Sequence, residues 1–260
     1  MTILLTGAAG RIGSALRERL PALGWEVRAF DRVPVDGGVA GDVTSAADLD
    51  AALRGVDAIV HLAGQPTEAP WAVVREANIE GTFQLFEAAR RNGVGRVVYA
   101  SSNHAVGFTP RPDVGQLPAD TPPRPDTLYG VSKVFGEALG RYYHDRYGLQ
   151  VACLRIGTFA ERPPDRRAQA TWLAPDDCAR LVDACLRSPK LGYALIWGIS
   201  ANRDRWWSLA AGAELGYQPQ QDASHYPVPD QPDDVPLDLV GGSFTLPDQG
   251  IDEIAARESR

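Results

Sequence analysis

The chain has 260 residues, of which 44% are hydrophobic and 23% are charged, and it carries a net charge of −7 at pH 7. These values are typical of globular proteins and exclude a disordered or fibrous chain. Lysine and arginine are scattered along the sequence, so the basic face that binds nucleic acid is absent and we expect no nucleic-acid partner. The length suits one large domain with a well-buried core.

No apolar stretch approaches the roughly 20 residues that cross a bilayer, so we expect no membrane partner. An apolar strand starts directly after Met1 without a preceding signal peptide, so the N-terminus is expected to belong to the fold, and the few cysteines predict a cytoplasmic protein. Cys153, Cys178 and Cys185 are too irregularly spaced for a disulfide framework and are expected to be buried thiols. The four histidines show no ligand spacing, so no metal is expected.

Short apolar runs alternate with longer amphipathic stretches along residues 1–156. This rhythm predicts strands over 2–5, 26–30, 58–62, 96–100 and 150–156, a short strand near Val39, and helices over 11–23, 46–53, 72–91 and 129–147. Such alternation is typical of a Rossmann-type, doubly wound α/β fold, in which helices cover both faces of a parallel sheet.

The rhythm ends after residue 156, where Pro163 and Pro164 stand in an arginine-rich loop. The remaining sequence predicts a helix over 176–186, a strand over 193–197, a helix over 205–215 and a surface-following loop over 219–238. We therefore divide the single domain 1–260 into a dinucleotide-binding core, residues 1–156, and a small C-terminal substrate lobe, residues 157–260, packed on it.

A glycine-rich turn joins the first predicted strand to the first helix. It reads Gly7-Ala8-Ala9-Gly10-Arg11-Ile12-Gly13. Its glycines permit a tight turn and close approach to a pyrophosphate, which helix N-terminal amides then hold. An ordinary turn would use the same glycines, but the position between strand and helix favours a dinucleotide. The predicted cofactor-binding residues here are Gly7, Gly10, Arg11, Ile12 and Gly13.

Asp31 ends the second predicted strand, where a carboxylate can accept hydrogen bonds from an adenine ribose, which favours NAD over NADP. The neighbouring Arg32 is the feature that would suit a 2′-phosphate instead. Further cofactor contacts are expected at later strand ends and in one covering helix. They are Asp42 and Val43 beside the adenine, Leu62, Ala63 and Gly64 beneath the nicotinamide-side ribose, Asn78 holding a backbone group or a water, and Ile156. His61 is interpreted as a hydrogen-bonded core histidine.

Tyr129 and Lys133 are four residues apart, which places them on one face of a helix. The pKa of tyrosine is about 10, but a nearby ammonium and a positive nicotinamide ring stabilise its phenolate, so Tyr129 can take a hydroxyl proton. Ser102 and Asn103 follow the fifth predicted strand, at the sheet edge where ligands of this fold bind. Either of the two can touch the reacting oxygen.

Together these motifs resemble those of the extended short-chain dehydrogenases, the superfamily of NAD-dependent epimerases and dehydratases. Several further blocks resemble the uronate dehydrogenases, and the likeness covers nearly the whole chain. These blocks are residues 100–104, 128–133, 154–157, 197–198 and 241–244. The resemblance implies an NAD-dependent oxidoreductase that oxidises C1 of ring-form D-galacturonate or D-glucuronate to an aldarolactone. It also implies a homo-oligomer.

The same resemblance implies the sugar site. It makes Tyr129 the base and Lys133 the residue that lowers its pKa. The expected sugar contacts are Ser102, Asn103, His104, Tyr129, Thr158, Arg167 and Phe244. Arg167 is the candidate for the uronate carboxylate, because a planar guanidinium binds that group through two hydrogen bonds, and Arg162 and Arg166 are alternatives. Past Gly64, where the family often has serine, this chain has Gln65 and Pro66.

Two other functions fit the same fold, because a fold alone does not determine function. A nucleotide-sugar epimerase or reductase needs a larger C-terminal lobe than residues 157–260 provide. A non-catalytic dinucleotide-sensing regulator needs no tyrosine and lysine pair. Both remain alternatives at this point.

Overall fold

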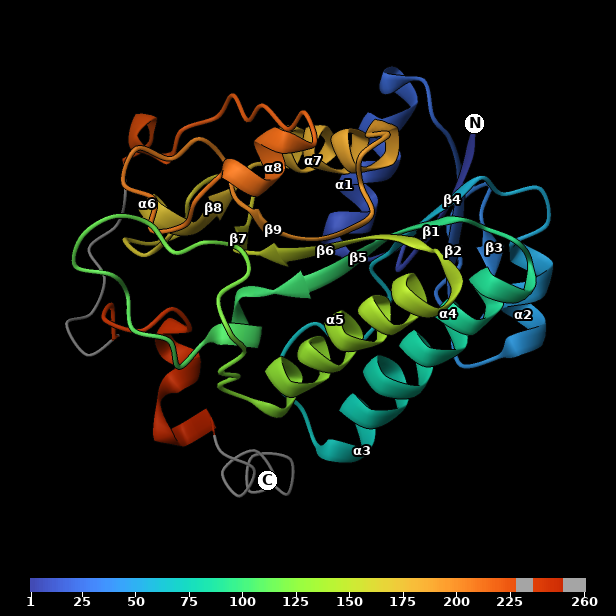
Figure 1. Ribbon diagram of the computed structural model, residues 1–260, viewed down its shortest axis with the longest axis horizontal. Helices are drawn as coiled ribbons and strands as arrows, with labels where there is room; N and C mark the ends of the chain where they lie inside the picture. The colour runs from blue at the N-terminus through green and yellow to red at the C-terminus, as the bar shows by residue number, and fades with distance from the viewer. Residues whose placement is uncertain (228–235, 250–260) are drawn as a thin grey trace.

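The computed structural model describes residues 1–227 and 236–249, and within them a seven-stranded parallel sheet lies between two layers of helices (Figure 1). Its strands, in spatial order, are β3 (Val39–Ala40), β2 (Glu26–Asp31), β1 (Thr2–Thr6), β4 (Ala58–His61), β5 (Arg96–Ser102), β6 (Gln150–Ile156) and β9 (Tyr193–Gly198). The chain runs outwards from β1 to β3, returns to β4 and continues to β9. The doubly wound fold predicted from the sequence is confirmed, and the reversal between β1 and β4 creates a ligand-binding crevice at the carboxyl ends of the strands.

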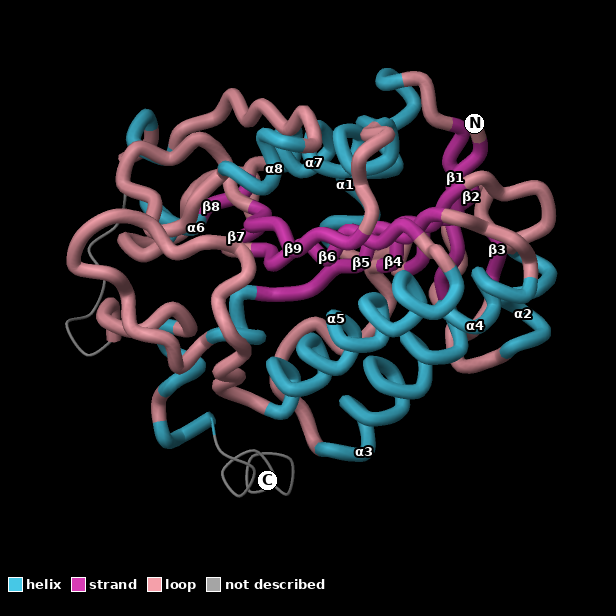
Figure 2. The backbone as a smooth tube through the Cα atoms, in the orientation of Figure 1, coloured by secondary structure: helices cyan, strands magenta, loops and turns pink. Residues whose placement is uncertain are grey.

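Each face of the sheet has its own helices (Figure 2). One face is covered by α1 (Arg11–Arg19) and α7 (Pro175–Arg187), and the other by α2 (Ala46–Ala52), α4 (Gly81–Arg91) and α5 (Leu128–Tyr147). No helix in the described part of the chain is long and apolar enough to cross a membrane.

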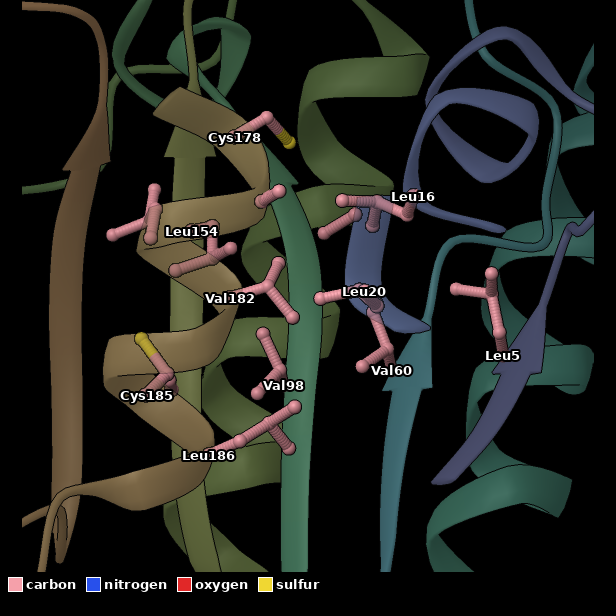
Figure 3. Packing of buried hydrophobic residues seen from close by; sticks show 14 of the residues in the cluster. Leu5, Leu16, Leu20, Val60, Val98, Leu154, Cys178, Val182, Cys185 and Leu186 are labelled. Atoms are coloured by element: carbon pink, nitrogen blue, oxygen red, sulfur yellow. The ribbon is translucent and has the colours of Figure 1, made fainter. Parts of the chain in front are cut away.

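The layer of α1 and α7 shows how the sequence builds the core (Figure 3). Helix α7 starts at Pro175, a residue favoured in the first helical position, and has Asp176 and Asp177 in its first turn, where acidic side chains favour the helix dipole. Its apolar residues recur at helical spacing and all pack on the sheet. They include Cys178, Val182, Cys185 and Leu186. Cys153 is buried on β6, and all three cysteines are free thiols.

Three predicted helices differ from the observed ones. The helix predicted over 11–23 ends at Arg19 and continues as a 3₁₀ turn, Leu20–Leu23, because Pro21 lacks the N–H that an α-helix needs. The helix predicted over 72–91 is observed as three consecutive pieces, which are α3 (Trp71–Val74), a π-helical turn (Arg75–Glu80) and α4.

The third predicted helix, over 205–215, is wrong in its first half, since α8 covers only Ala210–Glu214. The preceding residues pair with another loop, where Leu117 N–H donates to the Trp206 carbonyl at 2.8 Å. The Trp207 ring stacks on Trp197 with centroids 4.3 Å apart. Packing of these large aromatic rings therefore decides the backbone conformation there.

The chain after β6 also forms elements that the sequence does not indicate. They are β7 (Thr158–Phe159), α6 (Ala168–Thr171) and β8 (Trp172–Leu173), with β7 and β8 paired in a separate small sheet. Of the loop predicted over 219–238, residues 228–235 lie outside the described residues.

A fully buried ion pair lies between β6 and α5. Arg155 donates from Nε and Nη2 to the two carboxylate oxygens of Glu137, both at 2.8 Å. Its Nη1 donates to the carbonyls of Ala119 and Thr121, and Ser101 Oγ donates to Glu137 Oε1 at 2.6 Å. This network joins β5, β6 and α5 directly behind the carboxyl end of the sheet.

We expect Arg155→Met to lower the free energy of unfolding by about 3–5 kcal/mol, because it leaves the Glu137 charge buried without its partner. Urea denaturation measures this loss. The matched control is Arg141→Met on the surface of α5, where the pair with Asp145 is more than half exposed on both sides and contributes little. Equal, small losses for both variants would contradict the role given to the buried pair.

Candidate active site

The glycine-rich turn after β1 has no room for side chains. Gly7 has a φ of 70°, and a Cβ there would lie 2.7 Å from Ala63 N. A Cβ on Gly13 would lie 2.1 Å from the Gly7 carbonyl oxygen. The turn therefore brings backbone without side chains to the start of α1, an arrangement that suits phosphate groups. These residues fit the pyrophosphate of a dinucleotide.

A cavity of about 800 Å³ follows the carboxyl ends of the strands. The structure brings nearly all of the expected cofactor residues to its wall: Gly7, Gly10, Arg11, Ile12, Gly13, Asp31, Asp42, Val43, Leu62, Ala63, Gly64, Tyr129, Lys133 and Ile156. Ser102, Asn103 and His104 line it as well. Its volume is in the range of cofactor sites, and the catalytic candidates share it with the dinucleotide turn.

At the β2 end of the cavity, Asp31 is fixed by backbone donors. Its two carboxylate oxygens accept hydrogen bonds from Ala9 N–H and Val33 N–H, each at 2.9 Å. The neighbouring Arg32 extends toward Asp42, with 3.9 Å between Nη1 and Oδ2. The geometry thus offers a carboxylate to a ribose, while the exposed arginine lies near a second acid.

Asn78 does not belong to the cavity wall, which corrects its expected contact with the cofactor. Its Oδ1 accepts from Gln65 N–H at 2.6 Å, and its Nδ2 donates to the Gln65 carbonyl and to Ser132 Oγ at 3.1 and 2.9 Å. The side chain holds a backbone group, as expected, and so ties the loop after β4 to α5. Its action on a cofactor is indirect.

Tyr129 and Lys133 are both buried at the start of α5. Lys133 Nζ donates to the Ala100 carbonyl at 2.9 Å and lies 5.4 Å from the centroid of the Tyr129 ring. Burial raises the pKa of Tyr129 to about 12, while a hydrogen bond with Ser102 opposes this rise. Burial also lowers the pKa of Lys133 to about 8. In the chain without a cofactor, burial is the largest influence on the pKa of Tyr129.

Glu68 is a site residue that the sequence did not reveal. Its carboxylate accepts hydrogen bonds from Leu128 N–H at 3.2 Å and Tyr129 N–H at 2.7 Å, and Thr127 Oγ1 accepts from Gly130 N–H at 3.0 Å. These are unpaired donors of the first helical turn, and a negative charge is favoured there. Glu68 thus fixes the end of α5 that carries Tyr129.

Ser102 and Asn103 have different surroundings. Ser102 hydrogen-bonds Tyr129, and its Oγ accepts from His104 N–H at 3.2 Å. In the amide orientation that its neighbours require, Asn103 donates to the Ile156 carbonyl and accepts from Arg167 Nη2, both at 3.0 Å. Ser102 therefore faces the tyrosine, and Asn103 faces the arginine.

Arg167 is held by several acceptors beside Asn103. Its Nη1 donates to Thr158 Oγ1 at 3.3 Å and its Nη2 to the Val240 carbonyl at 2.5 Å. Burial lowers the pKa of Arg167 to about 10, so it is charged at neutral pH. The side chains of Arg162 and Arg166 are exposed instead. Of the three arginines, Arg167 reaches the catalytic residues through Asn103.

His104 and Phe244 complete this group. Their ring centroids are 4.2 Å apart, and the His104 ring lies 6.0 Å from that of Tyr129. Phe244, an expected sugar contact, comes from the segment after the Gly241-Gly242 pair and lies against His104. His104 Nδ1 also lies 2.8 Å from Oδ2 of the buried Asp126, a residue that the sequence did not single out.

Comparison with known proteins agrees with this geometry, since residues 3–169 match the model of the NAD dependent epimerase/dehydratase family. The chain belongs to this family. It is 40% identical over 256 residues to uronate dehydrogenase of Agrobacterium fabrum, with 93% of this chain and 96% of the relative covered. It is 39% identical to the NAD-dependent glucose-6-phosphate dehydrogenase of Haloferax volcanii, with 88% and 97% covered.

A solved structure gives the same picture. It is a tyrosine-to-alanine mutant of uronate dehydrogenase from Agrobacterium tumefaciens complexed with NAD. The TM-score is 0.88 at 39% sequence identity, and the match covers 96% of this chain and 98% of that chain. The likeness of fold extends well past the residues matched by the family model.

His61 is buried next to the candidate active site and is a core histidine, as interpreted from the sequence. Its Nδ1 is 2.8 Å from Thr6 Oγ1 and its Nε2 is 3.4 Å from Thr82 Oγ1. Burial lowers the pKa of His61 to about 3, and the charge of Lys133 acts in the same direction. The folded protein keeps this ring neutral.

Between pH 6.5 and about 3 the unfolded chain binds a proton at His61 that the folded chain does not, so acid should destabilise the fold there. From pH 7 to pH 5 this group removes about 2 kcal/mol. We expect His61→Gln to lose that much less free energy of unfolding over the same interval, measured by urea denaturation. His225→Gln, at an exposed histidine, is the control. Parallel losses in wild type and His61→Gln would contradict the assignment.

Proposed function

We propose that this enzyme is a uronate dehydrogenase that oxidises C1 of ring-form D-galacturonate or D-glucuronate to the aldarolactone, with NAD as cofactor. The observation that carries the proposal is the position of Arg167. Its guanidinium bonds to Asn103, which lines the same cavity as Tyr129, Lys133 and the dinucleotide turn. A sugar with its C1 at the tyrosine would therefore find a buried positive charge for its carboxylate.

The residues of the cavity fit NAD in distinct roles. The bare backbone of the glycine turn and the start of α1 would hold the pyrophosphate, and Asp31 would bind the adenine ribose. When bound, NAD supplies the hydride acceptor. Lys133 lies beside Tyr129 and is the candidate for the nicotinamide-side ribose.

Proton transfer belongs to Tyr129 and Ser102. The C1 hydroxyl gives its proton to the Tyr129 oxygen, and the Ser102 hydroxyl, already bonded to Tyr129, holds the reacting oxygen. The protonated Lys133, 5.4 Å from the Tyr129 ring, favours the phenolate through its charge. Glu68 and Thr127 keep this end of α5 in place.

Recognition of the sugar acid belongs to a group of residues that comes from both parts of the chain. Arg167 binds the carboxylate, Thr158 and Asn103 orient the guanidinium, and His104 and Phe244 form the facing wall. Thr158, Arg167 and Phe244 support the assignment of residues 157–260 as a substrate lobe, to which the core, 1–156, adds Asn103 and His104. A nucleotide-sugar epimerase and a non-catalytic sensor are not favoured, since the likeness to uronate dehydrogenase spans 93% of the chain and the Tyr129 and Lys133 pair is intact.

We also infer a homo-oligomer formed through α4 and α5. These helices expose the large apolar side chains of Phe83, Val131, Tyr142 and Tyr147, each at least 40% accessible. A second copy of the chain, presenting the same face, would cover them, as in most symmetric oligomers.

A cytoplasmic location is proposed too, because the three cysteines are free thiols.

The first test is NADH formation by the purified enzyme with NAD and either galacturonate, glucuronate, glucose 6-phosphate, glucose or galactose. We expect turnover with the uronates and little with the neutral sugars, and weaker turnover when NADP replaces NAD.

The Tyr129→Phe variant should lose at least a thousandfold in kcat, while its affinity for NAD, measured by calorimetry, should equal that of the wild type. The proposal fails if NAD-binding enzyme reduces no cofactor with either uronate, or if Tyr129→Phe keeps its rate.

A second test isolates the carboxylate contact. We expect Arg167→Met to raise KM for the uronate by about 10- to 150-fold, because a hydrogen bond to a charged group contributes about 1.5–3 kcal/mol. Its KM for NAD should stay near the wild-type value. Arg166→Met, at the exposed neighbouring arginine, is the matched control and should be indistinguishable from wild type. A larger effect of Arg166→Met would move the carboxylate site to the surface of the loop.

A further inference from the structure

Asp126 joins two walls of the sugar site that come from distant parts of the chain. Its side chain is fully buried just before α5. Its Oδ2 lies 2.8 Å from His104 Nδ1, and its Oδ1 accepts from Thr127 Oγ1 at 3.0 Å. The carboxylate therefore contacts both the imidazole and the residue that caps the catalytic helix.

The first consequence concerns the proton on His104. An ionised carboxylate only accepts hydrogen bonds, so the Asp126 contact requires the hydrogen on Nδ1. In the neutral ring, Nε2 is then an acceptor. His104 lines the cavity, and within residues 1–227 and 236–249 its Nε2 has no hydrogen-bond partner. A sugar hydroxyl is a suitable donor for it.

The second consequence concerns the segment that we name the C-terminal strap, residues 238–245. It pairs with residues 107–111, where Val240 N–H donates to the Thr109 carbonyl at 3.0 Å and Gly241 N–H to the Gly107 carbonyl at 2.8 Å. The strap brings the Val240 carbonyl to Arg167 and the Phe244 ring to His104. It thus supplies part of the proposed sugar pocket.

Asp126 lies directly under the strap. A Cβ on Gly241 would be 2.0 Å from Asp126 Oδ2, and a Cβ on Gly107 would be 1.8 Å from the same atom. Gly241 has a φ of −75° and Gly107 one of −58°, which any residue can adopt. Both positions therefore need glycine for space alone, so that the strap and the loop before it can close on the carboxylate.

We propose that Asp126 is a positioning residue that fixes the His104 tautomer and seats the C-terminal strap, and so sets affinity for the sugar without affecting affinity for NAD. The inference deepens the proposed function and rests on it. The carboxylate does not line the cavity, and its hydrogen bonds go to His104 and Thr127, neither of which is an expected cofactor contact. It acts through His104 and through the backbone at Gly241.

Asp126→Asn tests the pairing with almost no change in size. Thr127 Oγ1 donates to one oxygen, so the amide oxygen should take that place and the amide NH2 should face His104 Nδ1. That arrangement moves the ring hydrogen to Nε2 and removes the acceptor. We expect KM for the uronate to rise at least tenfold, with kcat within threefold of wild type and the calorimetric Kd for NAD unchanged.

Gly241→Ala tests the seat of the strap by a separate route. It should raise the same KM, because its Cβ cannot fit beside Asp126, while NAD binding stays intact. The matched control is Gly95→Ala, where a Cβ meets no atom within 4 Å. The proposal is overturned if both variants keep the wild-type KM, or if Kd for NAD and KM for the uronate rise together.

The tautomer has a readout that needs no turnover. In ¹⁵N-histidine NMR spectra, with the His104 signals identified from their loss in His104→Gln, wild type should show a protonated Nδ1 and an unprotonated Nε2. Asp126→Asn should reverse this pattern. A wild-type ring with its hydrogen on Nε2 would overturn the proposal. If the enzyme reduces no NAD with uronates while the NMR result holds, the proposed function fails and the pairing by Asp126 stands.

Discussion

The site depends above all on the fixed position of the first turns of α5. That short stretch carries Tyr129 and Lys133, and groups from several other segments hold it in place. Glu68 and Thr127 bind its free backbone donors, Asn78 bonds to Ser132, and further along the helix Glu137 is paired with Arg155. A helix end buried without such partners would be unstable, so each of these contacts stabilises the fold and sets the position of the catalytic oxygen.

Burial gives the catalytic pair its electrostatic character. The interior that orders Tyr129 and Lys133 also disfavours their charged forms, raising the pKa of the phenol to about 12 and lowering that of the amine to about 8. Ser102 opposes the change at the tyrosine with its hydrogen bond. A positively charged ligand ring beside the pair would oppose the effect of burial on the tyrosine and favour the phenolate.

Much of the architecture could be predicted from the sequence, because the core follows simple periodicity and the cofactor turn is continuous in the chain. The strands of the parallel sheet and the residues lining the cavity from Gly7 to Gly64 follow from that local information. Glu68 and Asp126 could not be found in this way. Glu68 binds Tyr129, which lies 61 residues later in the sequence, and Asp126 binds His104, which lies 22 residues earlier. No local sequence pattern marks either carboxylate. The 205–215 segment was mispredicted for a similar reason, since stacking of Trp207 on Trp197 overrides local helix preference. The tyrosine pKa also depends on depth of burial, which a sequence motif does not contain.

The position of the C-terminal strap near the end of the sequence has an evolutionary consequence. The parts that bind the dinucleotide and move the proton lie before residue 157, whereas Thr158, Arg167 and the strap, which supply part of the proposed sugar pocket, follow it. Substitutions in the later half can therefore accumulate, and new sugars can be accommodated, while the hydride-transfer machinery is left intact. One relative, 39% identical with 88% of this chain covered, is named as an NAD-dependent glucose-6-phosphate dehydrogenase. Part of the substrate range can thus change within one domain without changes to the residues that transfer the proton.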